Sequence, residues 1–347
     1  MSKRWKNRPE GSNWGDFGPN DQLGRLNLLT PEKVKQGVAE VSEGLSFCLS
    51  LPLNLPGKNL LNPRRYAPVL RPTELDGTPF INFPAARIDA AYPDIISDDA
   101  VLLWTQYSSQ WDSLAHVGQY FDADGDGKPE VVYYNGYRGG EHVVGPVDFH
   151  DGDRSTGCEY AGVSALGIEN MAAKPIQGRG VMIDLRAHFG DHRKLVTFAD
   201  LKGVMEADGV VVERGDMVCF HTGFADRILD MNGEPDVEVL HAACAALDGR
   251  DPELLQWVAD SGVAALIADN YAVEAHPSSP GEGDRHAMLP LHEHCLFKLG
   301  IPLGEIWYLS EFAGWLRSNG RYRFLLTAPP LRLPGAVGSP ANPIATV

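Results

Sequence analysis

The stretch Thr105-Gln106-Tyr107-Ser108-Ser109-Gln110-Trp111-Asp112-Ser113-Leu114-Ala115-His116 sets an aspartate and a histidine four residues apart. The apolar run 101–104 comes directly before it. We therefore expect Asp112 and His116 to project from the end of a strand into a common site. Such a pair alone is more often a capped turn or a satisfied polar pair, so a second cluster is needed to indicate chemistry.

His292 and Glu305 supply that second cluster. His292 lies just before a helix-like apolar run, and Glu305 follows the turn Gly-Ile-Pro-Leu-Gly at 300–304. Imidazole and carboxylate groups bind Zn²⁺ or Mn²⁺, and such sites are assembled from segments distant in sequence. His294 would point elsewhere on a helix and is not included.

The two clusters and the sequence between them resemble the cyclase-like family of metal-dependent hydrolases, which includes bacterial kynurenine formamidase and isatin hydrolase. The family signature reads His-x-Gly-Thr-His-x-Asp-x-Pro-x-His, and Asp112 and His116 match its Asp and last His. Gln106 and Gln110 stand where the signature has its two earlier His. The pattern Trp-Asp-Ser-Leu-x-His is similar to a longer branch of the family. The resemblance covers nearly the whole chain, through segments 13–15, 21–24, 26–32, 178–184, 215–216, 222–223, 269–270, 274 and 338–343.

This resemblance implies metal ligands at Asp112, His292 and Glu305, with His116 as the general acid/base and Glu305 sharing that work. It implies an α/β fold of the swivelling β/β/α type with mixed sheets, built as a single catalytic domain over residues 1–347. It also implies a homodimer or homotetramer in which neighbouring subunits help to close the sites.

The two Gln replacements change the expected metal site. An amide oxygen is a neutral, harder donor than imidazole, so the preference shifts from zinc toward manganese or magnesium. We expect one divalent ion, Mn or Zn, rather than two. Gln110 could ligate through its oxygen, whereas Gln106 could instead hydrogen-bond to a ligand. A site that has lost its metal is the alternative.

Metal-bound water has a pKa near neutrality, and a metal ion polarises a carbonyl. An imidazole such as His116 can take a proton from water and return it to the leaving group. The sequence thus predicts a hydrolase that cleaves an amide, lactone or ester acyl bond of a small cyclic or aromatic substrate. The alternatives are a cyclase or dehydratase with the same metal, or a non-catalytic small-molecule binding protein.

Several further side chains are expected to support the ligands or to contact substrate. Tyr134 belongs to an aromatic segment that could stack on a planar substrate or cover the core. Asp269 follows the apolar run 263–267 and could instead cap a turn. His221, at another strand end, is expected to be structural. The supporting set is Gln106, Trp111, Tyr134, Asp269 and Glu274.

The acidic segment Asp122-Ala123-Asp124-Gly125-Asp126-Gly127 has the opening of a calcium loop. Its twelfth position is Tyr133, where an EF-hand needs a bidentate Glu. We favour a solvated acidic turn over a calcium site. The segment could also line the mouth of the site.

Composition and motifs exclude other classes. The net charge of −16 argues against nucleic acid or anionic membrane as partners. The sequence contains no Gly-x-Ser-x-Gly elbow, no phosphate-cradling loop and no His-Glu-x-x-His helix. The basic residues at its start are followed by no apolar stretch, so we do not expect a secretory signal, and no apolar run is long enough to span a membrane. Five widely spaced Cys fit reduced thiols in a cytoplasmic protein.

Short apolar strands alternate with helical stretches, which predicts an α/β domain. Residues 1–30 are expected to form an arm on a neighbouring subunit or a lid over the pocket. The Pro-rich stretches 51–72 and 328–343 are expected to wrap the surface or a partner. We predict helices at 31–41, 198–207, 252–260 and 310–318, and strands at 180–185, 217–221, 263–267 and 322–326.

Overall fold

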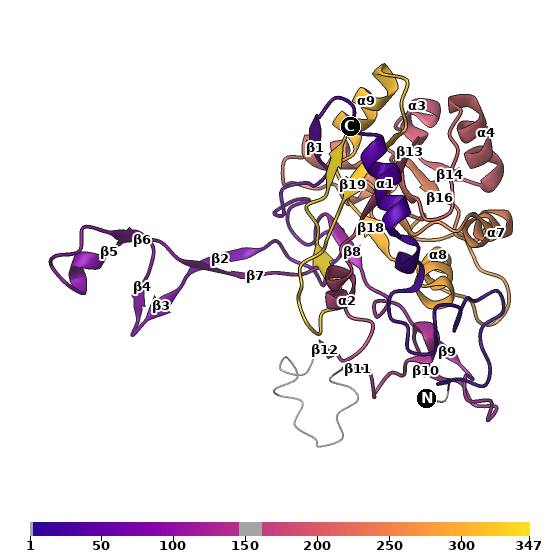
Figure 1. The fold of residues 1–347 in the computed structure, drawn as a ribbon, viewed down its shortest axis with the longest axis horizontal. Coiled ribbons are helices and arrows are strands. Elements are labelled where there is room, and N and C mark those ends of the chain that lie inside the picture. Colours follow the sequence, from indigo (N-terminus) through magenta and orange to yellow (C-terminus); the bar gives the residue numbers. More distant parts are fainter. Residues whose placement is uncertain (1–2, 146–161) are drawn as a thin grey trace.

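The computed structural model describes residues 3–145 and 162–347. Its centre is a nine-stranded sheet in the order β1-β21-β19-β13-β15-β17-β18-β8-β20 (Figure 1). Four neighbouring strands run parallel, namely β13 (Gln177–Asp184), β15 (Met217–His221), β17 (Ala265–Ala268) and β18 (Leu303–Glu305). The outer strands pair antiparallel, namely β1 (Ser46–Cys48), β21 (Ile344–Thr346), β19 (Arg323–Thr327), β8 (Gln110–Asp112) and β20 (Gly338–Pro340). The predicted α/β class with a mixed sheet is confirmed.

Side chains of the parallel strands alternate between two cores, because successive residues of a strand point to opposite faces. Val218 and Phe220 of β15 pack in one core with α4 (Phe198–Asp208) and α7 (Pro252–Ser261). Met217 and Cys219 pack in the other with α9 (Ser310–Ser318). We call these sides the α7 face and the α9 face. Both faces are buried, which explains the continuous apolar runs of these strands.

Local signals fix several helix ends. In α1 (Pro31–Ala39) the Thr30 hydroxyl accepts from the Lys33 amide, and Pro31 occupies the first turn. Thr197 and Asp200 form a capping box at the start of α4. The four predicted helices and four predicted strands are confirmed, with small shifts at their ends. The remaining helices are η1 (Gly24–Leu28), η2 (Ala85–Arg87), η3 (Tyr134–Gly136), α2 (Ile168–Ala173), α3 (Leu185–Phe189), α5 (Phe224–Asp230), α6 (Val237–His241), α8 (Pro290–His292) and the π-helical η6 (Glu293–Leu299).

A long two-stranded arm projects from the body (Figure 1). Its base pairs β2 (Val69–Pro72) with β7 (Asp99–Leu102), and its outer part contains β3 (Glu74–Leu75), β4 (Thr78–Pro79), β5 (Phe83–Pro84) and β6 (Ile95–Ile96). The apolar run 101–104 therefore begins in the returning strand of the arm. The prediction that this run forms the strand carrying Asp112 into the site was wrong. Asp112 belongs to the separate strand β8. Strand propensity alone does not say which partner a strand will find.

The acidic segment at 122–127 joins β9 (Gln119–Phe121) to β10 (Glu130–Val132). The Asp122 carboxylate accepts from the backbone amides of Gly125, Asp126 and Gly127. The turn is therefore closed by hydrogen bonds between this side chain and its own backbone. Carboxyl oxygens of Asp122, Asp124 and Asp126 also lie within 4.8 Å of one another. The other short strands are β11 (Val143–Val144), β12 (Gly162–Val163), β14 (Lys194–Val196) and β16 (Ala245–Leu247).

The two ends of the chain join the body. Trp14 is buried, and its indole N–H donates to the Phe297 carbonyl at 2.8 Å, so the N-terminal segment packs on its own chain. The second Pro-rich stretch lies on the surface only in part, because residues 331–334 are exposed whereas β20 pairs with β8 in the central sheet. Pro340 is tolerated there since β20 is an edge strand. Among the described helices, none is long and apolar enough to cross a bilayer.

Candidate metal site

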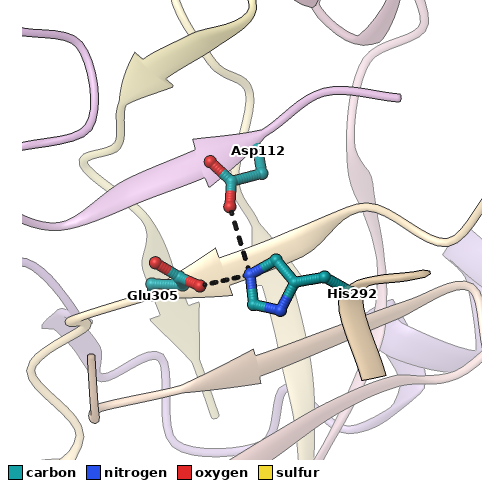
Figure 2. Close-up of side chains that lie close together, drawn as sticks. All are labelled: Asp112, His292 and Glu305. Carbon is teal, nitrogen blue, oxygen red and sulfur yellow. Dashed lines mark hydrogen bonds and ion pairs between the residues drawn. The ribbon is translucent and has the colours of Figure 1, made fainter. Parts of the chain in front are cut away.

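Three buried side chains converge on the α7 face of the sheet. Asp112 ends β8, Glu305 ends β18, and His292 ends α8 (Figure 2). Gln110 lies opposite Glu305 in the antiparallel pair, and Asp112 follows two residues later on the same face. One ligand atom from each of the three acidic or imidazole groups lies within 4.8 Å of the others. Strand pairing therefore brings together residues almost two hundred positions apart.

Glu274 fixes the orientation of His292. One Glu274 oxygen accepts from the His292 backbone amide at 2.9 Å and lies 2.8 Å from His292 Nδ1. The other accepts from the Leu291 amide at 3.0 Å. A Cβ at Gly249 would lie 2.0 Å from Glu274 Oε2, so glycine is required for this close approach. With Nδ1 engaged, His292 presents Nε2 to Glu305 Oε1 at 3.1 Å and Asp112 Oδ2 at 3.9 Å.

The donor set fits a divalent metal ion. Asp112 Oδ2 and Gln110 Oε1 are buried and accept no hydrogen bond from the described residues. Carboxylate, imidazole and amide oxygen ligands suit Zn²⁺ or Mn²⁺. Gln110 donates its amide N–H to Glu305 Oε2 at 2.8 Å, which fixes its side chain against one member of the trio.

His116 and Gln106 lie on the more exposed side of Asp112. The Gln106 amide group donates to Asp112 Oδ1 at 3.3 Å and lies 2.7 Å from His116 Nδ1. His116 Nε2 is 3.8 Å from Asp112 Oδ2. The His116 side chain is 20% exposed, whereas that of Asp112 is fully buried. His116 is thus placed between Asp112 and the outside of the protein.

Burial and crowded charges shift the pKa values of these groups. Burial opposes the charged form of His292, but hydrogen bonds to Glu274 and Glu305 outweigh it and raise the pKa of His292 to about 10. Burial and the charge of Asp112 raise the pKa of Glu305 to about 7. Burial lowers the pKa of His116, although Asp112 partly opposes this. Carboxylates so crowded are the environment in which a cation is most stabilising.

Trp111 and Tyr134 do not reach this cluster, which corrects the expected role of Trp111 and, for Tyr134, favours the alternative that its ring covers the core. Trp111 alternates with Gln110 and Asp112 along β8 and therefore points to the α9 face. There its indole N–H donates to the Ala328 carbonyl at 2.8 Å. Tyr134 is buried with its ring against Gly300, past the end of η6.

Asp269 is also outside the cluster. It accepts from the Thr222 amide at 2.8 Å, the Thr222 hydroxyl at 2.6 Å and the Gly223 amide at 2.7 Å. Its role is the turn-capping one that the sequence left open. Of the expected supporting residues, the structure brings Gln106 and Glu274 to the three central side chains.

Arg65 is a residue near the site that sequence reasoning missed. Its guanidinium donates to the Gln106 carbonyl at 2.7 Å, and its positive charge acts on both His116 and Glu305. It lies in the Pro-rich stretch 51–72, which has no periodic pattern that would have pointed to a site.

The chain is similar to known proteins in sequence and in fold. Residues 49–275 match a cyclase family model described as "Putative cyclase". A crystal structure described as a novel cyclase is similar at 28% identity and a TM-score of 0.73, over 97% of each chain. A search of curated proteins gave no match.

Two isatin hydrolase structures share the fold. One is bound to the product analogue thioisatinate, with 14% identity, a TM-score of 0.53 and coverage of 92% of this chain and 99% of that chain. The other is isatin hydrolase A from Ralstonia solanacearum, with 15% identity, a TM-score of 0.53 and coverage of 91% and 97%. The family match spans well over half of the sequence, and the structural likeness extends over nearly all of it. The chain therefore belongs to the cyclase family.

Proposed function

We propose that the protein is a hydrolase that uses one divalent ion, Mn²⁺ or Zn²⁺, to cleave an amide, lactone or ester acyl bond of a small cyclic or aromatic molecule. The observation that carries this proposal is the buried trio Asp112, His292 and Glu305, with ligand atoms within 4.8 Å of one another. These three would hold the ion, and Gln110 could add its free oxygen. When bound, the ion would acidify water and polarise the substrate carbonyl.

The remaining chemistry falls to His116. It would accept a proton from the attacking water and return it to the leaving nitrogen or oxygen. Gln106 holds the ring through Nδ1, at 2.7 Å, and Glu274 keeps His292 in its orientation. Glu305 would share the proton transfer while it ligates.

The test is turnover of a panel of lactones, cyclic amides and formamides in ¹⁸O-labelled water. Isatin-type cyclic amides come first because isatin hydrolases share the fold. We expect products that contain one solvent oxygen, and we expect chelation to abolish turnover. Products without solvent oxygen would support a cyclase or dehydratase instead. Ligand binding without turnover by the metal-loaded protein would support a binding protein.

We also propose a homodimer or homotetramer. The arm supports this, because a two-stranded ribbon is marginally stable in water by itself and this one leaves apolar side chains exposed, including Leu70 at 70%, Ile88 at 67% and Leu102 at 56%. Light scattering on the full chain is the test. A dimeric or tetrameric mass is expected, and a monomeric mass would contradict the proposal.

A cytoplasmic location is proposed on the chemistry of the cysteines. The four described ones, Cys48, Cys219, Cys244 and Cys295, form no disulfide. Cell fractionation is the test, with recovery outside the cytoplasm as the contradicting result.

A further inference from the structure

A second histidine-centred cluster lies on the α9 face. Asp184 ends β13, His221 ends β15 beside it, and Ser310 is the first residue of α9. His221 Nδ1 is 2.7 Å from Asp184 Oδ1, and His221 Nε2 is 3.1 Å from Ser310 Oγ. These are the contacts of a serine nucleophile, its base and the carboxylate that orients the base.

Two residues of the cluster, His221 and Ser310, line a hollow at the surface. His221 itself is 3% exposed, and it lines a hollow of about 570 Å³ together with Ser310 and Tyr308. An adjoining groove of about 210 Å³ shares Ala187 and Arg317 with this hollow. Asp184 lines this groove, together with the mainly apolar side chains of Met182, Val210, Ala313, Leu316 and Tyr322. The helices α3 and α9 lie at the same end of the body in Figure 1. A small molecule with an apolar group therefore has room beside Ser310.

We propose that Asp184, His221 and Ser310 form a second, metal-independent site that hydrolyses small carboxylic esters. Ser310 Oγ attacks the ester carbonyl, and its proton passes to His221 Nε2. The C–O bond to the alcohol breaks, and His221 gives that proton to the departing alkoxide. Water then attacks the acyl-serine, its proton returns through His221 to Ser310 Oγ, and a carboxylic acid leaves.

The position of Ser310 on its helix supports the first step. The first N–H groups of a helix have no acceptor within it and carry a partial positive charge. Ser310 stands at the start of the nine-residue helix α9. The amides that follow it are therefore donors for the oxyanion that forms on the carbonyl.

The surroundings of His221 suit a base that Asp184 orients. Burial disfavours the imidazolium, but the hydrogen bond to Asp184 and the charge of Asp269 outweigh it and raise the pKa of His221. Arg186 acts in the opposite direction. Asp184 also accepts from Ala187 at 3.1 Å and pairs with Arg317, which fixes its carboxylate.

The test is labelling of the full chain with a fluorophosphonate, followed by peptide mapping and hydrolysis of p-nitrophenyl acetate. We expect the label on Ser310, and its loss together with ester hydrolysis in Ser310→Ala. Ser318→Ala on the same helix is the matched control and should label normally. His221→Gln should slow labelling by about 10³-fold or more.

Labelling should also survive chelation and the Asp112→Ala substitution, which separates this site from the metal site. In the unmodified protein, labelling should rise with pH as His221 loses its proton. This measurement does not depend on whether any variant folds. The proposal would be overturned by no label on Ser310, by a flat pH profile, or by equal labelling in folded His221→Gln. The cluster would then only connect α9 to the sheet.

Discussion

The two faces of one sheet carry two histidines in similar settings. His292 on the α7 face and His221 on the α9 face are each 3% exposed, and each engages a carboxylate through Nδ1 at 2.7–2.8 Å. They differ in what meets Nε2. His292 meets Glu305 and Asp112, whereas His221 meets the hydroxyl of Ser310.

This difference shows how the partner of a histidine decides its chemistry. Two carboxylates beside Nε2 concentrate negative charge and oxygen donors, which is a setting for a cation. A hydroxyl beside Nε2 offers a proton that the imidazole can take, which is a setting for a nucleophile. The carboxylate on Nδ1 performs the same orienting task in both.

The largest expected effect is on the α7 face. Asp112→Ala should remove metal-dependent hydrolysis, because it deletes one of the three proposed ligands and leaves only Glu305 and His292 to hold the ion. Asp184→Ala makes the equivalent deletion on the α9 face and should leave that hydrolysis in place. Steady-state assays give the rate of metal-dependent hydrolysis in both variants. Equal losses in the two folded proteins would contradict separate roles for the two faces.

His116→Ala should lower turnover by about 10²–10⁴-fold, the usual contribution of a general acid/base, while the metal stays bound. Its imidazole lies 3.8 Å from Asp112 and is not part of the group of three side chains that could hold the metal. Turnover rates and metal content of the same preparation are the measurement. Full activity in this variant would show that another group moves the proton.

Glu274→Gln should weaken metal affinity by about 10–100-fold, the usual cost of losing a group that orients a ligand. Its carboxylate makes hydrogen bonds to His292 and Leu291 that an amide can only partly replace. A competition titration with a chromogenic chelator gives the affinity. Unchanged affinity would mean that α8 alone orients His292.

The smallest expected effect is on stability. Asp184→Asn removes the charge that His221 faces and should lower the free energy of unfolding by about 1.5–3 kcal/mol. The pKa of His221 is raised in the folded chain, so its contribution is complete below the unfolded value of about 6.5 and is lost as pH rises through the folded value. The pKa of Asp184 is lowered, mainly through His221 against the opposing effect of burial, so its contribution is lost as pH falls below about 3.9.

The deficit of Asp184→Asn relative to the unmodified protein should therefore be largest between about pH 4 and 6.5. Urea denaturation of both proteins, inside this window and well above it, is the measurement. A deficit independent of pH would show that the His221–Asp184 ion pair does not stabilise the fold.

The sequence predicted best what depends on local signals. The helices at 31–41, 198–207 and 252–260 were predicted close to their observed bounds, and in the structure Thr30, Thr197 and Asp251 cap their starts. The apolar run 217–221 has the composition of a buried strand. Asp112 was assigned through the family signature and His292 and Glu305 through the wider family resemblance, and the structure brings the three together.

The wrong predictions came from strand pairing, which local sequence patterns do not predict. The run 101–104 looked like a strand leading to the site, yet it belongs to the arm. Trp111 could have been excluded from the site by period-two alternation once Asp112 was taken to face it. The contacts of His221 with Asp184 and Ser310 were not predicted either, because they depend on the register of β13 with β15 and on the placement of α9.

Elemental analysis of the purified protein shows whether the trio on the α7 face holds a metal ion. The purified protein should contain about one Mn or Zn per chain, which Asp112→Ala should lose and Asp184→Ala should keep. No bound metal after incubation with Mn²⁺ and Zn²⁺, or equal metal in folded Asp112→Ala, would contradict the account.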